Sequence, residues 1–162
     1  MVSVVVREAT SKIDIEAAFA LRQQVFVGEQ KCDASREIDE WDSKIGGEAG
    51  SPQPLCFHFV ALPADGDLVT ATARLVSNYP EVGMGKVGRV AVRRDLRGQG
   101  LGKQIMSALE TKAREIGLSK LKLHSQCDKV AFYEKSGFRV LDADNVFYEE
   151  NIPHLAMIKD LQ

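Results

Sequence analysis

The chain contains 162 residues with a formal net charge of −2, and 44% of them are hydrophobic, values typical of one globular domain with its own core. We therefore expect a single domain over residues 1–162. The near-neutral charge argues against a general nucleic-acid binder, and no apolar run is long enough to cross a bilayer, so neither nucleic acid nor membrane is an expected partner. The 3 cysteines form no C-x-x-C pair, which predicts no disulfide framework and no metal site. A reducing cytoplasmic or nuclear interior is the default location.

The first half of the chain predicts a strand, a helix and a β-hairpin, in that order. The β-branched run Val2–Val6 is typical of a strand, and apolar residues from Ile15 to Phe26 recur at helical spacing, with the aliphatic stem of Arg22 on the same face. Residues 46–54 are rich in glycine and proline and predict a loop. Further strands are expected at Cys56–Leu62, Leu68–Val76 and Lys86–Val92, the first two joined through a turn at Ala64–Asp67.

The second half alternates helices with strands. An amphipathic helix from Leu101 ends before Gly117, and a short helix capped by Asp128 ends at Lys135. The remaining strands are expected at Lys120–Ser125 and His154–Ile158. This alternation predicts a mixed α/β fold.

The segment Val90–Lys103 carries the strongest chemical signal. A β-branched strand ends at Val92, and three alternate glycines, Gly98, Gly100 and Gly102, lead into the amphipathic helix. Glycines let backbone N–H groups approach a ligand closely, and the first turn of a helix attracts anions. Basic residues surround the glycines: Lys86, Arg89, Arg93, Arg94, Arg97 and Lys103. The segment therefore predicts a phosphate-binding cradle.

Two familiar cradles can be excluded by spacing. A P-loop would need glycine where Arg97 stands and serine or threonine where Gln104 stands. A dinucleotide fingerprint fails at Lys103 or at Ile105, depending on its starting glycine. The pattern Arg-x-x-Gly-x-Gly between a strand and a helix instead resembles the acetyl-CoA pyrophosphate loop of the GNAT superfamily of N-acetyltransferases. The alternative is a glycine-rich turn without a ligand.

A second segment, Ala131–Phe138, is similar to the A-x-x-F-Y-x-K-x-G-F helix of the same superfamily. The resemblance implies that the Tyr133 hydroxyl lies near the CoA sulfur and protonates the departing thiolate. The alternative is a core aromatic residue. Asp128 stands where the superfamily often has asparagine, so it can cap the helix but lacks the amide donors.

Further segments resemble the ElaA/YjcF-type branch of the superfamily. These are Leu21–Gln30, the E-x-D-x-x-D pattern from Glu37 to Asp42, His58–Ala61 and Phe147–His154. Asn151 replaces a recurrent glycine before I-P-H, and asparagine also tolerates a left-handed backbone.

The resemblance implies a mixed, mostly antiparallel central sheet flanked by helices. The strand before the cradle would separate from its neighbour, and acetyl-CoA would lie in the gap. An amine of a small molecule or peptide would attack the thioester directly, in a monomer or homodimer. The residues implied in cofactor binding are Val90, Ala91, Val92, Arg97, Gly98, Gln99, Gly100, Leu101, Gly102, Lys103, Asp128 and Lys135.

The general base is less narrowly defined. The candidates are Glu29, Glu37, Asp39, His58, His124, Glu149 and His154, of which Glu29 and Glu149 are preferred. The segment 28–50 is acidic, with Glu29, Asp33, Glu37, Asp39, Glu40, Asp42 and Glu48. We expect it to line the amine side of the cleft and favour a cationic acceptor, unless it is an ordinary solvated face.

Two other functions stay open on the sequence. One is a non-catalytic CoA-binding regulatory module of the same fold. The other is a nucleotide-phosphate binding domain unrelated to CoA, which ranks last because the P-loop serine or threonine and the ribose-binding pattern are absent.

Overall fold

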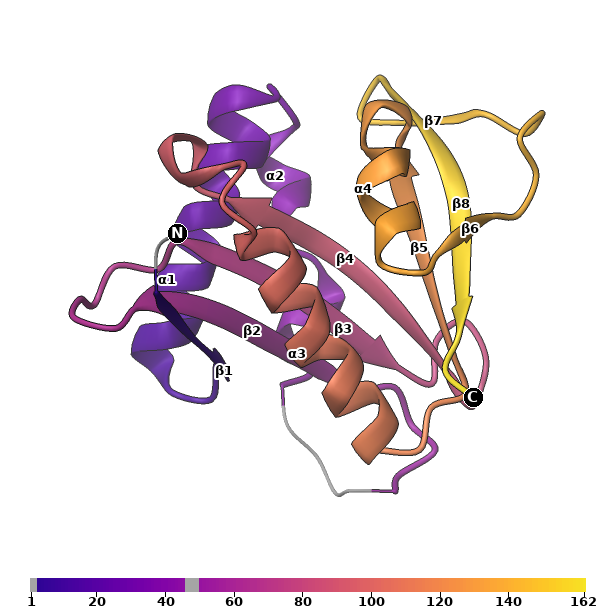
Figure 1. Ribbon diagram of the computed structural model, residues 1–162, viewed down its shortest axis with the longest axis horizontal. Helices are drawn as coiled ribbons and strands as arrows, with labels where there is room; N and C mark the ends of the chain where they lie inside the picture. Colours follow the sequence, from indigo (N-terminus) through magenta and orange to yellow (C-terminus); the bar gives the residue numbers. More distant parts are fainter. Residues whose placement is uncertain (1–2, 46–49) are drawn as a thin grey trace.

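A computed structural model of the protein describes residues 3–45 and 50–162. Within them, eight strands form one sheet in the order β1-β2-β3-β4-β5-β8-β6, and β7 pairs with β8 (Figure 1). All pairs are antiparallel except β4 with β5. The strands are β1 (Val4–Glu8), β2 (Cys56–Pro63), β3 (Ala71–Ser77), β4 (Met84–Val92), β5 (Lys120–Gln126), β6 (Arg139–Val140), β7 (Phe147–Glu149) and β8 (Ile152–Asp160).

Helices cover both faces of the sheet. The helical segments are α1 (Lys12–Arg22), the π-helix η1 (Gln23–Glu29), α2 (Ala34–Glu37), α3 (Leu101–Glu115), α4 (Val130–Lys135) and the 3₁₀ turns η2 (Glu40–Ser43), η3 (Arg94–Leu96) and η4 (Cys127–Lys129). In Figure 1, α3 crosses the front of β2–β4 and α1 lies behind them. The predicted mixed, mostly antiparallel sheet flanked by helices is confirmed.

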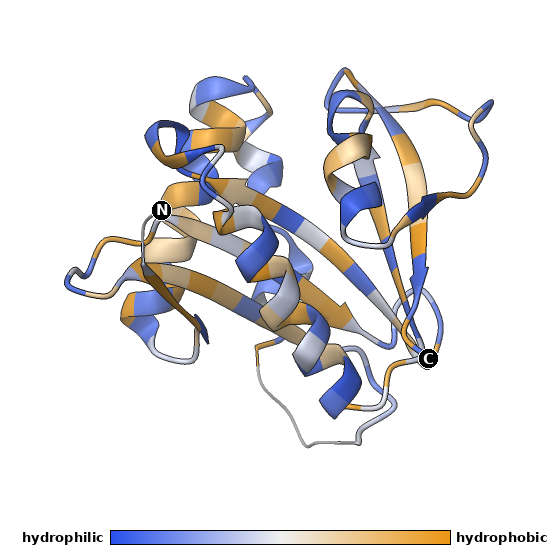
Figure 2. Cartoon of the chain, viewed as in Figure 1, coloured by the Kyte–Doolittle hydropathy of each residue, from blue (hydrophilic) through white to orange (hydrophobic). Residues whose placement is uncertain are grey.

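The hydrophobic core has two parts, one on each face of the sheet. Leu101, Ile105 and Leu109 of α3 pack against the strands on the front face, and Ala18 and Leu21 of α1 pack behind. Figure 2 shows the strands between the helices largely in hydrophobic colours, whereas the outer face of α3 is mostly hydrophilic. Burial of these apolar faces is the main force that holds the helices on the sheet.

The parallel strands β4 and β5 pair only over their first halves. Their register runs from Met84 opposite Lys120 to Val87 opposite Leu123. Beyond that point the two strands diverge (Figure 1), and no strand of the described residues lies beside the β5-facing edge of β4 from Gly88 onward. The predicted separation of the strand before the cradle is therefore present.

A bulge bends β4 at the same place. The register with β3 shifts between Thr72 and Arg74, which leaves Arg89 and Val90 opposite a single residue of β3. Arg89 adopts a left-handed φ of 52°, a conformation that costs energy for a residue with a side chain. The bulge turns the end of β4 away from β5.

Several element boundaries differ from expectation. The first strand runs from Val4 to Glu8, and Val2 lies outside the described residues, as do positions 46–49 of the predicted loop. The strand expected from Leu68 begins at Ala71, because Leu68 lies in the exposed loop of the hairpin. The last strand is longer than expected, and the short elements α2, η2, β6 and β7 carry too few residues to form a periodic pattern.

The helix predicted through Phe26 changes geometry part-way. Its α-helical part ends at Arg22, and a π-helix continues to Glu29. In a π-helix the backbone bonds close over five residues, a pattern that often marks a functional site. No helix among the described residues is long and apolar enough to cross a membrane.

Candidate active site

A cleft of about 900 Å³ opens where β4 and β5 diverge. Its walls come from the end of β4, the start of α3, α4, β5, β7 and the segment that follows η1. Most of the predicted site residues line it: Val90, Ala91, Val92, Arg97, Gly98, Gly100, Leu101, Gly102, Lys103, Tyr133, Lys135 and Glu149. Gln99, Asp128 and Glu29 do not contribute to its lining.

The glycines of the cradle have two different physical roles. Gly98 and Gly100 have φ values of 76° and 82°, and a Cβ on either would meet nothing within 4 Å. Their requirement is conformational, and the space in front of them is open. Gly102 lies inside α3, where a Cβ would come within 2.9 Å of the Phe132 ring. It lets α3 and α4 approach each other closely.

Arg97 links the cradle to η1. Its Nη2 donates to Glu29 Oε2 at 2.8 Å, and its Nε donates to the carbonyl of Val92 at 3.0 Å. Arg97 therefore holds a backbone acceptor at the open edge of β4. Glu29 lies at this end of the site, beside the cradle.

The basic residues predicted to form one cradle divide between two places. Arg97 and Lys103 remain at the start of α3, whereas Arg93 pairs with Asp95 at 2.6 Å on the surface. Lys86 and Arg89 belong to β4 and line the other part of the cleft. Strand alternation and the bulge therefore separate the basic side chains of β4 from those at the start of α3, although both groups line the same cleft.

Asp128 does not cap α4. Residues 127–129 form the turn η4, so the residue at the cap position is Lys129, which makes no side-chain capping bond. The Asp128 carboxylate is mostly exposed and lies 3.7 Å from Lys129 Nζ. The capping prediction was wrong because the helical turn already begins at Cys127, so Asp128 lies within the turn and not at the start of a helix.

Tyr133 packs in the core and also faces the cleft. Its ring lies edge-on to Phe132 and Phe138, with centroids 5.0 and 6.1 Å away. Burial raises the pKa of its hydroxyl to about 12, so this group stays protonated at neutral pH. Within the described residues, no protein group forms a hydrogen bond with that hydroxyl, which leaves its proton free for a ligand.

Glu149 of β7 lies at the point where β4 and β5 separate. Its Oε1 is 2.6 Å from Nδ1 of His124, and its Oε2 is 3.9 Å from Nε2 of His154. His124 directly follows Leu123, the last residue of β5 that pairs with β4. The hydrogen bond from His124 lowers the pKa of Glu149, which keeps this carboxylate ionised. Three of the predicted base candidates therefore form one cluster.

Comparison with known proteins gives a consistent result. A family model described as an acetyltransferase (GNAT) domain matches residues 56–161. A Bacillus subtilis protein whose name describes it as an acetyltransferase is 38% identical over 95% of both chains. The uncharacterized N-acetyltransferase YjcF of the same organism is 34% identical and covers 94% of this chain and 96% of its own length.

The chain belongs to the GNAT acetyltransferases.

Solved structures agree with this assignment. A Lactobacillus plantarum protein described as an N-acetyltransferase matches with a TM-score of 0.81 and 29% identity, over 99% of both chains. Escherichia coli ElaA matches with a TM-score of 0.77 and 28% identity, over 98% of this chain and 99% of its own. The N-acetylglutamate synthase of Neisseria gonorrhoeae, solved with coenzyme A and N-acetyl-glutamate, shares the fold with a TM-score of 0.68 at 21% identity, over 100% of this chain and 36% of its own.

In this acetyltransferase the acidic segment is largely neutralised by arginines. Arg22 is 1% exposed and donates to Glu37 at 2.7 Å and to Asp42 at 2.8 Å. Arg74 donates to Asp39 at 2.7 Å, and Arg89 also pairs with Glu37 and Asp39. We call these six residues the arginine–carboxylate network.

The network corrects three expectations. Arg22 is buried and its guanidinium group forms ion pairs, whereas the sequence predicted only that its aliphatic stem lies on the apolar face of the helix. Glu37 and Asp39, two of the candidates for the general base, are both ion-paired with guanidinium groups. Glu37, Asp39 and Asp42 therefore do not contribute free negative charge toward a cationic acceptor, whereas Asp33 of the same segment lines the cleft outside the network. Glu48 lies outside the described residues.

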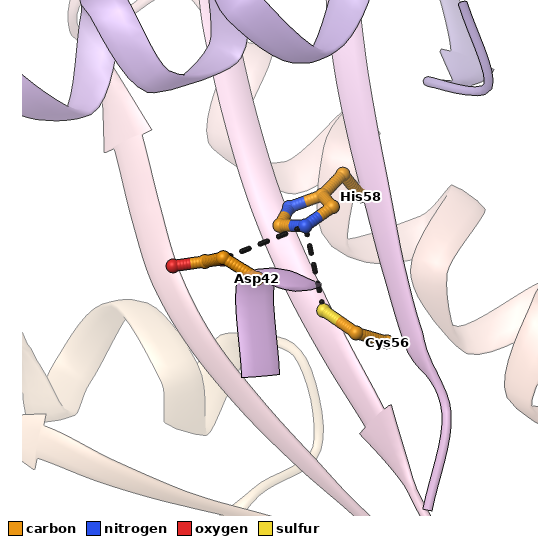
Figure 3. A group of neighbouring side chains, drawn as sticks. All are labelled: Asp42, Cys56 and His58. Atoms are coloured by element: carbon orange, nitrogen blue, oxygen red, sulfur yellow. Dashed lines mark hydrogen bonds and ion pairs between the residues drawn. The ribbon is translucent and has the colours of Figure 1, made fainter. Parts of the chain in front are cut away.

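Asp42, Cys56 and His58 form a compact buried group (Figure 3). His58 Nε2 lies 3.5 Å from Asp42 and 3.4 Å from the Cys56 sulfur. Burial raises the pKa of the Cys56 thiol to about 12, so it is not the thiolate that binds metals. Arg22 and Arg74 both donate to the same carboxylate and would repel a cation. These donors do not fit a metal ion, and His58 does not line the cleft.

Two cleft residues, Lys86 and Arg74, were not predicted as site residues. The sequence analysis listed Lys86 among the basic residues of the cradle because Lys86 is close to the cradle glycines in the sequence. Arg74 stands alone in an apolar strand, and that isolation of a charge in a buried strand is the one signal that could have identified it.

Proposed function

We propose that the protein transfers an acetyl group from acetyl-CoA directly to a primary amine of a small molecule or peptide. The observation that carries the proposal is the position of the cleft. It joins the open edge of β4 to the start of α3, with Tyr133 on one wall and Glu149 with His124 at the apex. A phosphate cradle, a strand edge and two proton-handling groups thus share one cavity.

The donor would bind along the first part of this cavity. Backbone N–H groups at the start of α3, helped by Arg97 and Lys103, suit a pyrophosphate. No strand of the described residues covers this edge of β4 at Val90 and Val92, and although Arg97 Nε already donates to the Val92 carbonyl, the remaining backbone groups suit the amide groups of pantetheine, as for an added strand. The family membership and the shared fold of a protein crystallised with CoA support this arrangement.

The chemistry then needs three proton transfers and no covalent enzyme intermediate. Glu149, with His124 beside it, takes a proton from the acceptor ammonium, and the neutral amine attacks the acetyl carbonyl. A carbon–nitrogen bond forms and the carbon–sulfur bond breaks. Tyr133 donates its proton to the departing thiolate and is reprotonated by the second proton that the amine nitrogen loses as it becomes an amide. Orientation in the cleft supplies much of the rate.

The test combines CoA binding with thiol release. CoA and acetyl-CoA are expected to raise the melting temperature of the protein, with much smaller effects of ATP and NAD at equal concentration. Gly100→Asn should remove the shift, because asparagine tolerates the left-handed backbone while its side chain enters the open space of the cradle. Gly117→Asn is the matched control, since Gly117 has a φ of 81° and equally open surroundings at the far end of α3.

The outcomes separate the proposal from its alternatives. A shift retained in folded Gly100→Asn would remove the cradle from the site. A CoA shift without thiol release for any amine would leave a non-catalytic CoA-binding module. A shift with ATP equal to that with CoA would favour a nucleotide-phosphate site.

A further inference from the structure

We infer that the acceptor is an amine that carries a neighbouring carboxylate, in the simplest case a free α-amino acid, and that Lys86 and Arg74 bind this carboxylate. The inference rests on the proposed function and names the substrate class of the same cleft. It replaces the cationic acceptor that the acidic segment 28–50 predicted.

Lys86 is a cation in the cleft without an anionic partner. Its Nζ lies 3.3 and 3.4 Å from the two ring nitrogens of His124. No carboxylate oxygen of the described residues lies within 4.0 Å of it. Burial lowers the pKa of Lys86, and the nearby Glu149 carboxylate offsets only part of this effect. A bound carboxylate would compensate that charge.

Arg74 offers a second donor on the same face of the sheet. Its side chain is 9% exposed, and its Nη1 donates to Asp39 and Asp42. Its Nη2 has no hydrogen-bond partner among the described residues, although Arg74 lines the cleft. Gly88 stands opposite Arg74 in the β3–β4 register, and even a Cβ there would remain 4.0 Å from Nη2. The missing side chain keeps this end of the guanidinium accessible.

Strand alternation places these groups together. Lys86 and Gly88 are two residues apart on β4, and the register sets them opposite Val76 and Arg74. Val87, between them, points into the core under α3, so Lys86 and Gly88 point to the other face. His124 also points there, because Leu123 is in the same core.

The arrangement of charge matches an amine and a carboxylate on adjacent atoms. Within the arginine–carboxylate network, three guanidinium groups face three carboxylates, so it offers little net attraction for either sign. Outside the network, the positive Lys86 lies directly beside His124, and the negative Glu149 lies 2.6 Å from that histidine. The cleft is also lined by Asp33 and by Arg36, which pairs with Glu150. An α-amino acid would place its carboxylate at Lys86 and its ammonium at the Glu149–His124 pair. A polyamine would place a second positive charge against Lys86, which is unfavourable.

The test compares amino acids with their carboxamides, which are close in size but lack this charge, in the thiol-release assay with acetyl-CoA at a pH where both amines are protonated. We expect kcat/KM to be about tenfold or more higher for the amino acids, chiefly through KM, as for a charge-assisted hydrogen bond. Lys86→Met should abolish this ratio and leave the CoA-induced melting shift unchanged. Lys122→Met is the matched control, since Lys122 pairs with Lys86 in register but does not line the cleft.

A second readout keeps the inference separate from the proposed function. N-acetyl amino acids should raise the melting temperature of the CoA complex more than N-acetyl amino-acid amides do, and Lys86→Met should erase that difference. Equal or faster transfer to carboxamides or polyamines would overturn the inference alone. Absence of transfer to any amine would overturn the proposed function, and the melting comparison would then decide whether the carboxylate subsite exists.

Discussion

The Tyr133 hydroxyl combines an apolar environment with an open hydrogen-bonding position. We predict that Tyr133→Phe lowers kcat by about 10²–10⁴-fold, the usual scale for a positioned acid, because it deletes only the proton donor. The melting temperature and the affinity for CoA should change little, since the ring keeps its contacts with Phe132 and Phe138. Steady-state thiol release and CoA titration measure the two quantities.

Tyr148→Phe is the control for this prediction. Tyr148 is 71% exposed on β7 and does not line the cleft, so its variant should behave as the parent. A decrease in kcat of less than about threefold in Tyr133→Phe would assign that residue to packing alone.

Glu149 is predicted to act in the step that deprotonates the acceptor. Its pKa is lowered by the His124 hydrogen bond, so the carboxylate is available throughout the neutral range. Glu149→Gln should lower kcat and make the rate rise more steeply with pH, because the variant depends on acceptor amine that has already lost its proton to solvent. The pH profile of kcat/KM measures this.

Glu150→Gln serves as the control, since Glu150 pairs with Arg36 at 3.2 Å, away from His124. An unchanged pH profile in Glu149→Gln would move the base to water or to a histidine.

At the scale of single residues, the sequence predicted which positions need a left-handed backbone, but it did not predict which side chains form ion pairs with one another. Gly98, Gly100 and Gly117 have the positive φ values that their positions imply, and so has Asn151, with a φ of 62°. A positive φ is a local requirement, and it can be read from the sequence because glycine or asparagine stands at the position. The partner of Glu29 is 68 positions away, and no pattern along the chain encodes that contact.

At the scale of elements, strand β4 has no space for a side chain at Gly85. A Cβ at Gly85 would lie 2.8 Å from side-chain atoms of Leu118 and Leu75 and 2.9 Å from Leu121. Gly85→Ala is therefore expected to lower the free energy of unfolding by about 1–3 kcal/mol through overpacking. Urea denaturation measures the change.

The same substitution at Gly88 provides the comparison. A Cβ there has only an ordinary contact at 4.0 Å, so Gly88→Ala should stay within about 0.5 kcal/mol of the parent. Equal losses for the two variants would show that strand propensity dominates over packing.

The long periodic elements were predictable, and the short ones were not. The apolar face of α3 and the hairpin of β2 and β3 follow from spacing and turn residues alone. The π-helix η1, the turn η4 and the two-residue strand β6 depend on tertiary contacts. The separation of β4 and β5 came from the family resemblance, since a bulge at Arg89 has no reliable local signature.

For the whole molecule, His58 couples folding to pH. Burial lowers its pKa from 6.5 to about 4, so between these values the unfolded chain binds a proton that the folded protein does not. The free energy of unfolding should therefore rise as the pH increases from about 4 to 6.5 and decrease as the pH falls through the same window. The full shift corresponds to about 3 kcal/mol.

Denaturation curves between pH 4 and pH 7 test this coupling, with His58→Gln as the comparison. The variant should show a shallower dependence on pH, because glutamine does not titrate. Parallel curves for the two proteins would mean that other groups control acid sensitivity.

The partly unpaired β4 strand also bears on how the protein behaves in concentrated solution. An open strand edge can template pairing with another chain, and natural proteins usually cover such edges. Here Arg97 occupies the carbonyl of Val92, while within the described part of the chain no strand lies beside the β5-facing edge from Gly88 onward. A ligand lying along that edge would act as its cover. We therefore expect saturating CoA to slow aggregation during storage and concentration, an effect that light scattering can follow independently of any enzymatic turnover.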